Sequence, residues 1–176
     1  MFVKFFKVVS STQEEAKDLA RKGGKPWSVI AAEKQSQGRG KGKSHWHSPE
    51  GNLYFSVVLP ASKLDDLQIL TILASFSVAK ILKEDYGLEA MIKLPNDVVV
   101  NGKKICGILT ENIIMSGQAK ISVMGIGLNT NSEDYTADLK DKATSIKMEL
   151  KEKVDNKKIL AKIVEELAKQ LSSITK

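Results

Sequence analysis

Apolar residues along the chain follow two periodicities, one typical of strands and the other typical of helices. Runs of β-branched and aromatic residues predict strands at 2–9, 28–32, 53–59, 91–93, 98–100, 104–114 and 119–125. Helical spacing predicts a short helix that begins at the capping-box sequence Ser11-Thr12-Gln13-Glu14, a long helix from 65 to about 86, and a last helix from 156 to about 172. The polar segment 132–156 is expected to be irregular.

Turn sequences indicate how the strands connect. Asn101-Gly102, the strongest short hairpin signal, joins two apolar runs, and Ser116-Gly117-Gln118 turns the chain into the next strand. Consecutive hairpins with a few helices, and no strict alternation of strand and helix, predict an α+β fold with a mixed, mostly antiparallel sheet flanked by helices. No repeat or linker divides the chain, so residues 1–176 are expected to form a single domain.

Composition narrows the class of protein further. The apolar fraction of 42% is ordinary for a globular protein, and no apolar run approaches the roughly 20 residues that span a bilayer, so no membrane partner is expected. Cys106 is the only cysteine, which excludes an internal disulfide framework and fits a cytoplasmic location. The net charge of +6 favours an anionic partner, and it leaves nucleotides, acidic proteins and nucleic acids open.

The segment 34–51 breaks all periodicity and contains four of the twelve glycines. Loops of this length inside a compact domain are usually functional. Cations alternate with glycines between Arg39 and Lys43. Glycine lets backbone N–H groups approach an anion closely, and arginine or lysine supplies the compensating charge. The loop therefore predicts a phosphate-binding site.

Two common phosphate-binding motifs do not fit this loop. Gly42-Lys43-Ser44 ends like a P-loop, but the first glycine of that motif would fall at Gln37, and Pro49 follows where a helix is needed. The dinucleotide pattern of three glycines fails because its third position is Lys43. A nucleic-acid-binding loop with Trp46 as a stacking residue stays open.

The whole loop resembles the signature of the biotin–protein ligase family. That signature reads Gln-x-x-Gly-Arg-Gly-Arg, then a tryptophan, then Ser-Pro-x-Gly-x-Leu-Tyr. The matching residues here are Gln35, Gly38, Arg39, Gly40, Trp46, Ser48, Pro49, Gly51, Leu53 and Tyr54. Lys41 stands where the family has its second arginine, so the charge is kept but the planar fork is lost. How tightly this chain retains a reactive adenylate is therefore an open question.

Further motifs of the same family follow in the family's order. Lys93-Leu94-Pro95-Asn96-Asp97 resembles Lys-Trp-Pro-Asn-Asp, and the stretch from Lys104 through Gly107 to Glu111 resembles Lys-x-x-Gly-Ile-Leu-x-Glu. The remaining similar segments are Ser11-Thr12-Gln13, Gly125-Ile126-Gly127-Leu128-Asn129 and Ala143-Thr144-Ser145-Ile146. Any one could arise by chance, whereas an ordered set covering residues 11–146 is hard to obtain otherwise.

The resemblance implies a class II synthetase-like catalytic fold and a two-step reaction. Biotin would be activated with Mg-ATP to biotinyl-5′-AMP and transferred to a lysine of a biotin carboxyl carrier protein. The implied catalytic residues are Arg39, Lys41 and Lys104. The implied biotin-binding residues are Ser11, Thr12, Gln13, Gln35, Gly38, Arg39, Gly40, Lys41, Lys104 and Gly107. The implied ATP-binding residues are Arg39, Lys41, Trp46, Lys93, Asn96, Asp97 and Asn129.

Plainer roles are open for several of these residues. Asn129 could be a turn residue, and Lys104 a solvated lysine at a strand end. His45 and His47 lack a third ligand, so we predict no metal site formed by protein side chains. Cys106, in an apolar strand, is predicted to be a buried core residue rather than a nucleophile.

The resemblance also bears on partners and on alternatives. Some family members carry a DNA-binding helix-turn-helix before the catalytic domain and others a small C-terminal β-domain; we expect neither here, and no DNA partner. A homodimer through a sheet edge is possible in this family. Two alternatives remain: a lipoate or octanoate ligase or transferase of the same architecture, and a non-catalytic nucleotide-binding module.

Overall fold

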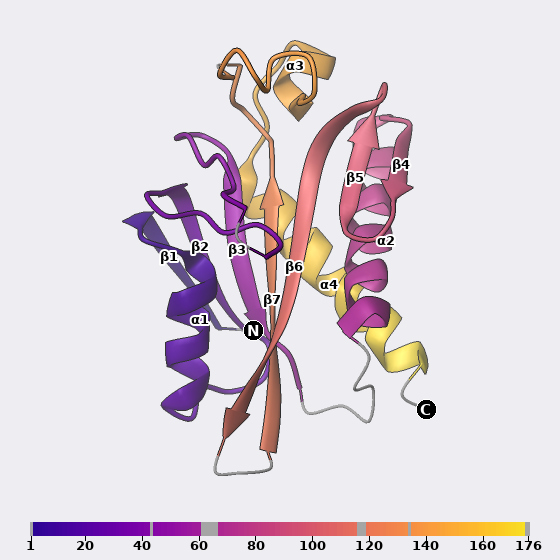
Figure 1. Ribbon diagram of the computed structural model, residues 1–176. Coiled ribbons are helices and arrows are strands. Elements are labelled where there is room, and N and C mark those ends of the chain that lie inside the picture. Colours follow the sequence, from indigo (N-terminus) through magenta and orange to yellow (C-terminus); the bar gives the residue numbers. More distant parts are fainter. Residues whose placement is uncertain (1, 43, 61–66, 116–118, 134, 175–176) are drawn as a thin grey trace.

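A seven-stranded sheet forms the centre of the computed structural model, which describes residues 2–42, 44–60, 67–115, 119–133 and 135–174 (Figure 1). Its strand order is β1-β2-β3-β7-β6-β5-β4. The strands are β1 (Phe2–Val9), β2 (Ser28–Gln35), β3 (Leu53–Val58), β4 (Ala90–Lys93), β5 (Asp97–Val100), β6 (Lys103–Met115) and β7 (Ala119–Leu128). The helices are α1 (Thr12–Arg21), α2 (Leu67–Tyr86), α3 (Ile146–Leu150) and α4 (Asn156–Ile174).

The sheet is mixed, as the sequence predicts. β1 and β2 run parallel, with α1 as the crossover between them, and the other neighbouring pairs are antiparallel. The hairpin from β5 to β6 turns at Asn101 and Gly102, which have φ of 50° and 75°. Only glycine and a few polar residues adopt this left-handed backbone at low cost, so the predicted turn is confirmed at both positions.

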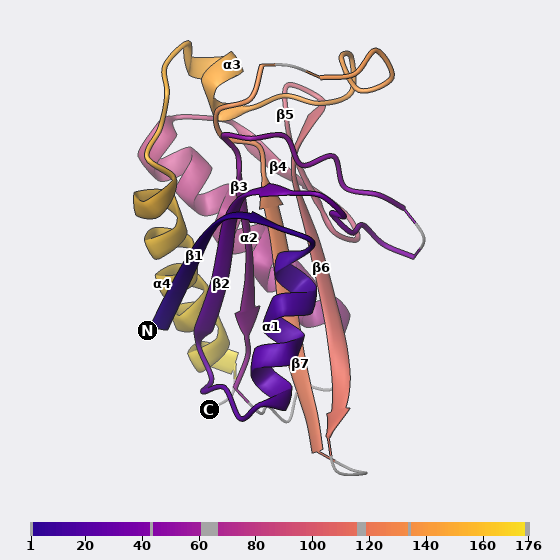
Figure 2. The same ribbon diagram turned by 90° about the vertical axis from the view of Figure 1, so that its left-hand side faces the viewer.

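Helices cover the two faces of the sheet unequally. α2 and α4 pack on one face and α1 lies on the other (Figure 2). Alternate residues of a strand point to opposite faces, so Leu53, Phe55 and Val57 of β3 join the large core under α2 and α4. Each such side chain stabilises the fold by about 1.5–3 kcal/mol on burial. The apolar cluster beneath α1 is much smaller, which leaves part of that face free for polar side chains.

Two local predictions were wrong. Ser11 occupies the N-cap of α1, but its hydroxyl makes no capping hydrogen bond, and the Glu14 carboxylate binds Lys17 and Arg39 instead. The segment 132–156 contains α3, whose N-cap Ser145 accepts a hydrogen bond from the Met148 N–H at 3.1 Å. Five residues are too few to show helical periodicity. The predicted start of the long helix at 65 and the turn at 116–118 lie outside the described residues.

Candidate active site

Three glycines hollow out the α1 face of the sheet. Gly125 and Gly127 of β7 and Gly107 of β6 are placed where a side chain would meet a neighbour. A Cβ on Gly125 would lie 2.6 Å from Gln13 Oε1, and one on Gly127 would lie 2.5 Å from Trp46 Nε1. A Cβ on Gly107 would lie 2.7 Å from the Trp46 ring. Backbone therefore forms the floor of a depression that other residues enclose.

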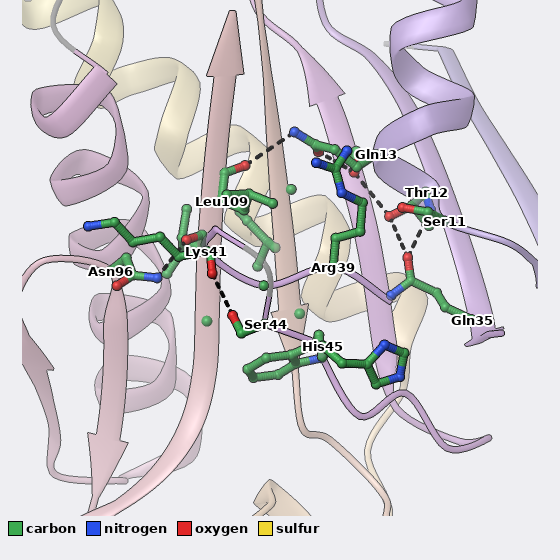
Figure 3. Close-up of a pocket in the computed structure, with 18 of the residues that line it drawn as sticks. Ser11, Thr12, Gln13, Gln35, Arg39, Lys41, Ser44, His45, Asn96 and Leu109 are labelled. Atoms are coloured by element: carbon green, nitrogen blue, oxygen red, sulfur yellow. Dashed lines mark hydrogen bonds between the residues drawn. The ribbon is translucent and has the colours of Figure 1, made fainter. Parts of the chain in front are cut away.

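The enclosed space is a cavity of about 280 Å³, which we call the first cavity. The N-terminus of α1, the end of β2, the glycine-rich loop and strands β6 and β7 surround it (Figure 3). Its polar and charged lining comprises Ser11, Thr12, Gln13, Gln35, Arg39, Lys41, Ser44, His45, Ser56, Asn96, Asp97 and Lys104. Such a wall suits a small ligand with several hydrogen-bonding groups.

Direct hydrogen bonds fix the amide groups in this wall. Gln35 Oε1 accepts from the Thr12 N–H at 2.8 Å and from the Thr12 hydroxyl at 3.1 Å (Figure 3). Gln13 Oε1 accepts from the Ser56 hydroxyl at 3.0 Å, while Gln13 Nε2 donates to Val123 O at 3.0 Å. Each amide thus has a defined orientation, and a ligand would meet groups that are already positioned.

Three buried polar atoms of the lining have no hydrogen-bond partner among the described residues. They are the Ser11 hydroxyl, the Trp46 indole Nε1 and Asp97 Oδ1, and only the last of them has an ion-pair partner, the Lys104 ammonium. Burial of a polar group without a partner is costly, and such groups in a cavity are usually satisfied by a ligand or by water. The Ser11 hydroxyl is therefore free to bond a ligand polar group because it does not cap α1.

The arginine of the glycine-rich loop is held by carboxylates. Arg39 extends toward Gln13 (Figure 3) and forms ion pairs with Glu14 and with Glu111, the latter at 3.2 Å. Lys17 contacts the same two carboxylates at 3.1 and 3.0 Å. Burial raises the pKa of Glu14, but the hydrogen bond and charge of Lys17, together with Arg39, outweigh it and leave that pKa below its usual range.

A second cavity, of about 730 Å³, adjoins the first. Trp46, Asp97, Lys104 and His45 line both cavities. The Lys104 ammonium lies 2.7 Å from Asp97 Oδ1 and 4.9 Å from the centre of the Trp46 ring. The other lining residues lie on β4 and β5, in the β5–β6 turn, in the glycine-rich loop and in the segment between β7 and α3, and they include Lys93, Val99, Asn129, Tyr135, Asp138, Leu139 and Lys142. Lys104 thus stands where two ligand sites would meet.

Residues 5–129 match the sequence model of the biotin/lipoate A/B protein ligase family. The chain belongs to this family. It is 38% identical over 161 residues to the bifunctional ligase/repressor BirA of Bacillus subtilis, covering 89% of this chain and 50% of that protein. Biotin–protein ligase 2 of Arabidopsis thaliana is 35% identical over 115 residues, covering 62% of this chain and 35% of the relative. The chain thus spans about half or less of the length of these relatives.

Solved structures of the family share the fold. A biotin protein ligase from Aquifex aeolicus in complex with biotin and ATP superposes with a TM-score of 0.88 at 29% identity, covering 99% of this chain and 72% of that chain. A Leishmania major ligase in complex with biotinyl-5-AMP gives a TM-score of 0.76 at 25% identity, covering 94% of this chain and 73% of that one.

Most residues that resemble the family's motifs meet at the two cavities. Ser11, Thr12, Gln13, Gln35, Arg39, Gly40, Lys41, Asn96 and Gly107 line the first cavity, Lys93 and Asn129 line the second, and Trp46, Asp97 and Lys104 line both. Gly38 lines neither. It is buried where a side chain would collide with Ser48 and with the backbone at Trp46, so it permits the fold of the loop.

Two amide side chains are engaged inside the protein. Asn96 Nδ2 donates to Ile108 O at 3.1 Å, although the resemblance assigns Asn96 to ATP. Asn129 Oδ1 accepts from Asn52 Nδ2 at 3.4 Å, and Asn129 Nδ2 donates to Thr144 O at 3.0 Å. Both side chains are therefore placed to hold backbone segments around the site, whatever contact a ligand adds.

Sequence reasoning missed three contributors to the site. Ser56 bonds both Thr12 and Gln13, and Glu14 and Glu111 hold Arg39. Glu14 stands in the capping-box sequence and Glu111 in the motif that begins at Lys104, so the positions of these two were visible in the sequence. Their contacts were not, since they join strands and helices far apart in the chain.

The histidines line the cavities, whereas the cysteine lies in the core. His45 is exposed and His47 is half-buried, and the described residues contain no group of three or more His, Cys, Asp or Glu that could hold a metal ion. Cys106 is fully buried, and this burial raises the pKa of its thiol, so the prediction of a core residue is confirmed. In the described part of the chain no helix is long and apolar enough to cross a membrane.

Proposed function

We propose that the chain activates biotin with ATP to biotinyl-5′-AMP and transfers the biotinyl group to a lysine of a biotin carboxyl carrier protein. The observation that carries this proposal is the junction of the two cavities at Lys104, Asp97 and Trp46. A reaction that joins a carboxylate to a nucleotide phosphate is favoured by two adjoining sites, which position the reactants, and by a cation between them, which offsets their charge repulsion. Family relatives named as biotin–protein ligases support the choice of substrates.

The first step brings two anions together. A carboxylate oxygen of biotin attacks the α-phosphorus of ATP, and the bond from that phosphorus to pyrophosphate breaks. At about 4 Å and an effective dielectric near 20, one pair of like charges repels by roughly 4 kcal/mol. Lys104, at the junction, would offset this repulsion, and Arg39 and Lys41 would hold the phosphate from the loop side.

The first cavity suits the polar ring of biotin. The Ser11 hydroxyl has no partner, and Thr12 and Gln35 stand beside it with fixed orientations. These groups would bond the ureido head, while the Trp46 ring and the glycine floor would enclose the apolar part. Little reorganisation would be needed on binding, which favours affinity.

The second cavity suits the nucleotide. Apolar side chains such as Val99, Leu139 and Ala143 line it together with Lys93 and Asn129. Asp97, Asp138 and Asp141 add carboxylate oxygens to the wall, and although the described residues gather no three such groups at one point, one or two carboxylates fit an Mg²⁺ ion carried in by ATP. When bound, Mg²⁺ would neutralise part of the negative charge of the phosphates.

The second step needs no covalent group from the enzyme. The neutral amine of the carrier lysine attacks the acyl carbon of biotinyl-5′-AMP, the bond from that carbon to the AMP oxygen breaks, and the amine loses a proton. AMP leaves. The role of the chain is to hold the mixed anhydride and keep its phosphate charge compensated.

The test is transfer of biotin to a purified carrier domain with Mg-ATP, read by streptavidin blot and by pyrophosphate release. Lipoate and octanoate run in parallel, because the family model also covers lipoate ligases. Lys104→Ala and Arg39→Ala are expected to lose adenylate formation by about 100-fold or more while remaining folded. Lys103→Ala, one residue away, is the matched control. Wild-type rates in both site variants would refute the site assignment, and labelling by lipoate alone would refute the substrate.

A further inference from the structure

Four charged residues form a closed network beside the first cavity. Glu14 and Lys17 come from α1, Arg39 from the glycine-rich loop and Glu111 from β6. Arg39 and Lys17 each contact both carboxylates. Two positive and two negative charges therefore compensate one another, and the loop is tied to the sheet through Arg39.

In this network Arg39, the residue that the proposed function assigns to phosphate binding, is already paired with two carboxylates. An anionic ligand that approaches Arg39 must either displace the carboxylates or share the guanidinium with them. Displacement opposes binding because the ion pairs of Arg39 are lost, and sharing opposes it because the ligand and the carboxylates repel each other. The side chain of Arg39 is 39% exposed and that of Glu14 is 43% exposed, so water and salt can enter and the pairing is readily exchanged.

Lys17 compensates the two carboxylates when Arg39 exchanges them for a ligand. Its side chain is only 9% exposed, and it touches Glu14 and Glu111 at 3.1 and 3.0 Å. If Arg39 leaves, both carboxylates keep a cation. Glu111 also accepts a hydrogen bond from Gln13 Nε2 at 3.1 Å, and Gln13 accepts one from Ser56 in the first cavity. The network and the wall of the first cavity thus share Gln13.

We infer that Glu14 and Glu111 are positioning residues that hold Arg39 in the ligand-free chain and yield it to an anionic ligand. This inference rests on the proposed function, since it concerns the same arginine. The carboxylates keep the loop ordered before the substrate arrives, and they lower the affinity of the empty site for anions. Removing one carboxylate should therefore tighten anion binding and loosen the empty loop.

The test compares Glu14→Gln and Glu111→Gln with the control Glu15→Gln, which removes the same charge one residue away. None of the ion pairs found for Arg39 in the described chain involves Glu15. Inorganic pyrophosphate is the probe, and its affinity is measured by calorimetry at two salt concentrations. Tryptic cleavage after Arg39, read by mass spectrometry, reports the ligand-free loop. Finally, KM and kcat for Mg-ATP are measured separately for each variant.

Glu14→Gln and Glu111→Gln are each expected to tighten pyrophosphate binding by about two- to fivefold, the range of a partly exposed ion pair. Cleavage after Arg39 is expected to speed up in the free protein and to slow when pyrophosphate is added. KM for Mg-ATP should fall with little change in kcat. Glu15→Gln should change none of these.

A double-mutant cycle isolates the role of Arg39. In an Arg39→Ala background, Glu14→Gln should have no further effect on pyrophosphate affinity. The same tightening in that background, unchanged or weaker binding in Glu14→Gln, or an equal effect of Glu15→Gln would each overturn the inference. If wild type makes no adenylate but Glu14→Gln tightens pyrophosphate binding through Arg39, the proposed function fails and this inference stands.

Discussion

The two cavities differ in what builds their walls. The first is enclosed by strands, by the N-terminus of α1 and by the glycine-rich loop, and its glutamine amides are hydrogen-bonded to residues of neighbouring elements. The second is enclosed largely by the irregular segment between β7 and α3. Sheet register sets the geometry of the residues that strands contribute to a wall. Residues of an irregular segment must instead be positioned by their own hydrogen bonds.

Asn52 is the main anchor of the second cavity. Its side chain is fully buried, and Oδ1 accepts from the backbone N–H groups of Thr130, Asn131 and Ser132 at 3.0, 3.0 and 2.9 Å. Asn131 adds a bond from Val154 N to its Oδ1 at 2.9 Å. Side-chain hydrogen bonds therefore place this loop, and Asn52 alone supplies three of them.

The largest effect is expected from a substitution at the boundary between the two cavities, measured as the rate of adenylate formation. Gly127→Ala would place a Cβ 2.5 Å from Trp46 Nε1, so the indole must move. Displacement of about 1 Å in a catalytic site can cost about 100-fold in rate. We expect that loss in adenylate formation, with a change in tryptophan fluorescence and little change in thermal unfolding. Activity within twofold of wild type would mean that Trp46 does not separate two ligand sites.

The next largest effect concerns Asn52. Asn52→Ala leaves three backbone N–H groups without their acceptor, and it is expected to lower the free energy of unfolding by about 1–3 kcal/mol in urea denaturation. KM for ATP should rise more than KM for biotin, since only the second cavity loses its anchor. Asn112→Ala, which removes a hydrogen bond near the tip of the β6–β7 hairpin, is the control. Equal changes in both KM values would contradict the separation of the cavities.

A smaller effect is expected in the first cavity. Ser11→Ala removes a buried hydroxyl that has no partner in the described chain, so the free energy of unfolding should stay the same or rise by up to about 1 kcal/mol. Biotin affinity should nevertheless fall by up to about tenfold, the loss of one hydrogen bond to the ligand. Calorimetry with biotin and thermal unfolding measure the two. Ser10→Ala, at an exposed neighbour, should change neither.

The smallest effect is expected for chemical labelling of Cys106, on the core side of β6. Burial raises the pKa of the Cys106 thiol, so the thiol stays protonated and unreactive in the native protein at pH 8. Labelling with a thiol-specific disulfide reagent should proceed only as fast as global unfolding, measured in parallel by circular dichroism. Rapid labelling of the native protein would show that the core beneath the junction opens locally.

Much of the fold and part of the site could be predicted from the sequence, because those features depend on neighbouring residues. Strand and helix periodicity, the turn at Asn101-Gly102 and the glycine-rich loop with Arg39 and Lys41 are local patterns. The ordered motifs also indicated which residues gather at one site, and the family membership agrees with them. The roles assigned to individual side chains, the homodimer and the cytoplasmic location stay predictions.

Only the tertiary structure decided how those residues are used. Gln35 meets Thr12 across 23 residues and Arg39 meets Glu111 across 72, and no local rule specifies such pairs. The same contacts turned Ser11 from a helix cap into a free hydroxyl and engaged Asn129 with Asn52 and Thr144. A polar side chain bonds whichever partner the packed elements bring within about 3 Å, and that partner is set by sheet order and register rather than by its sequence neighbours.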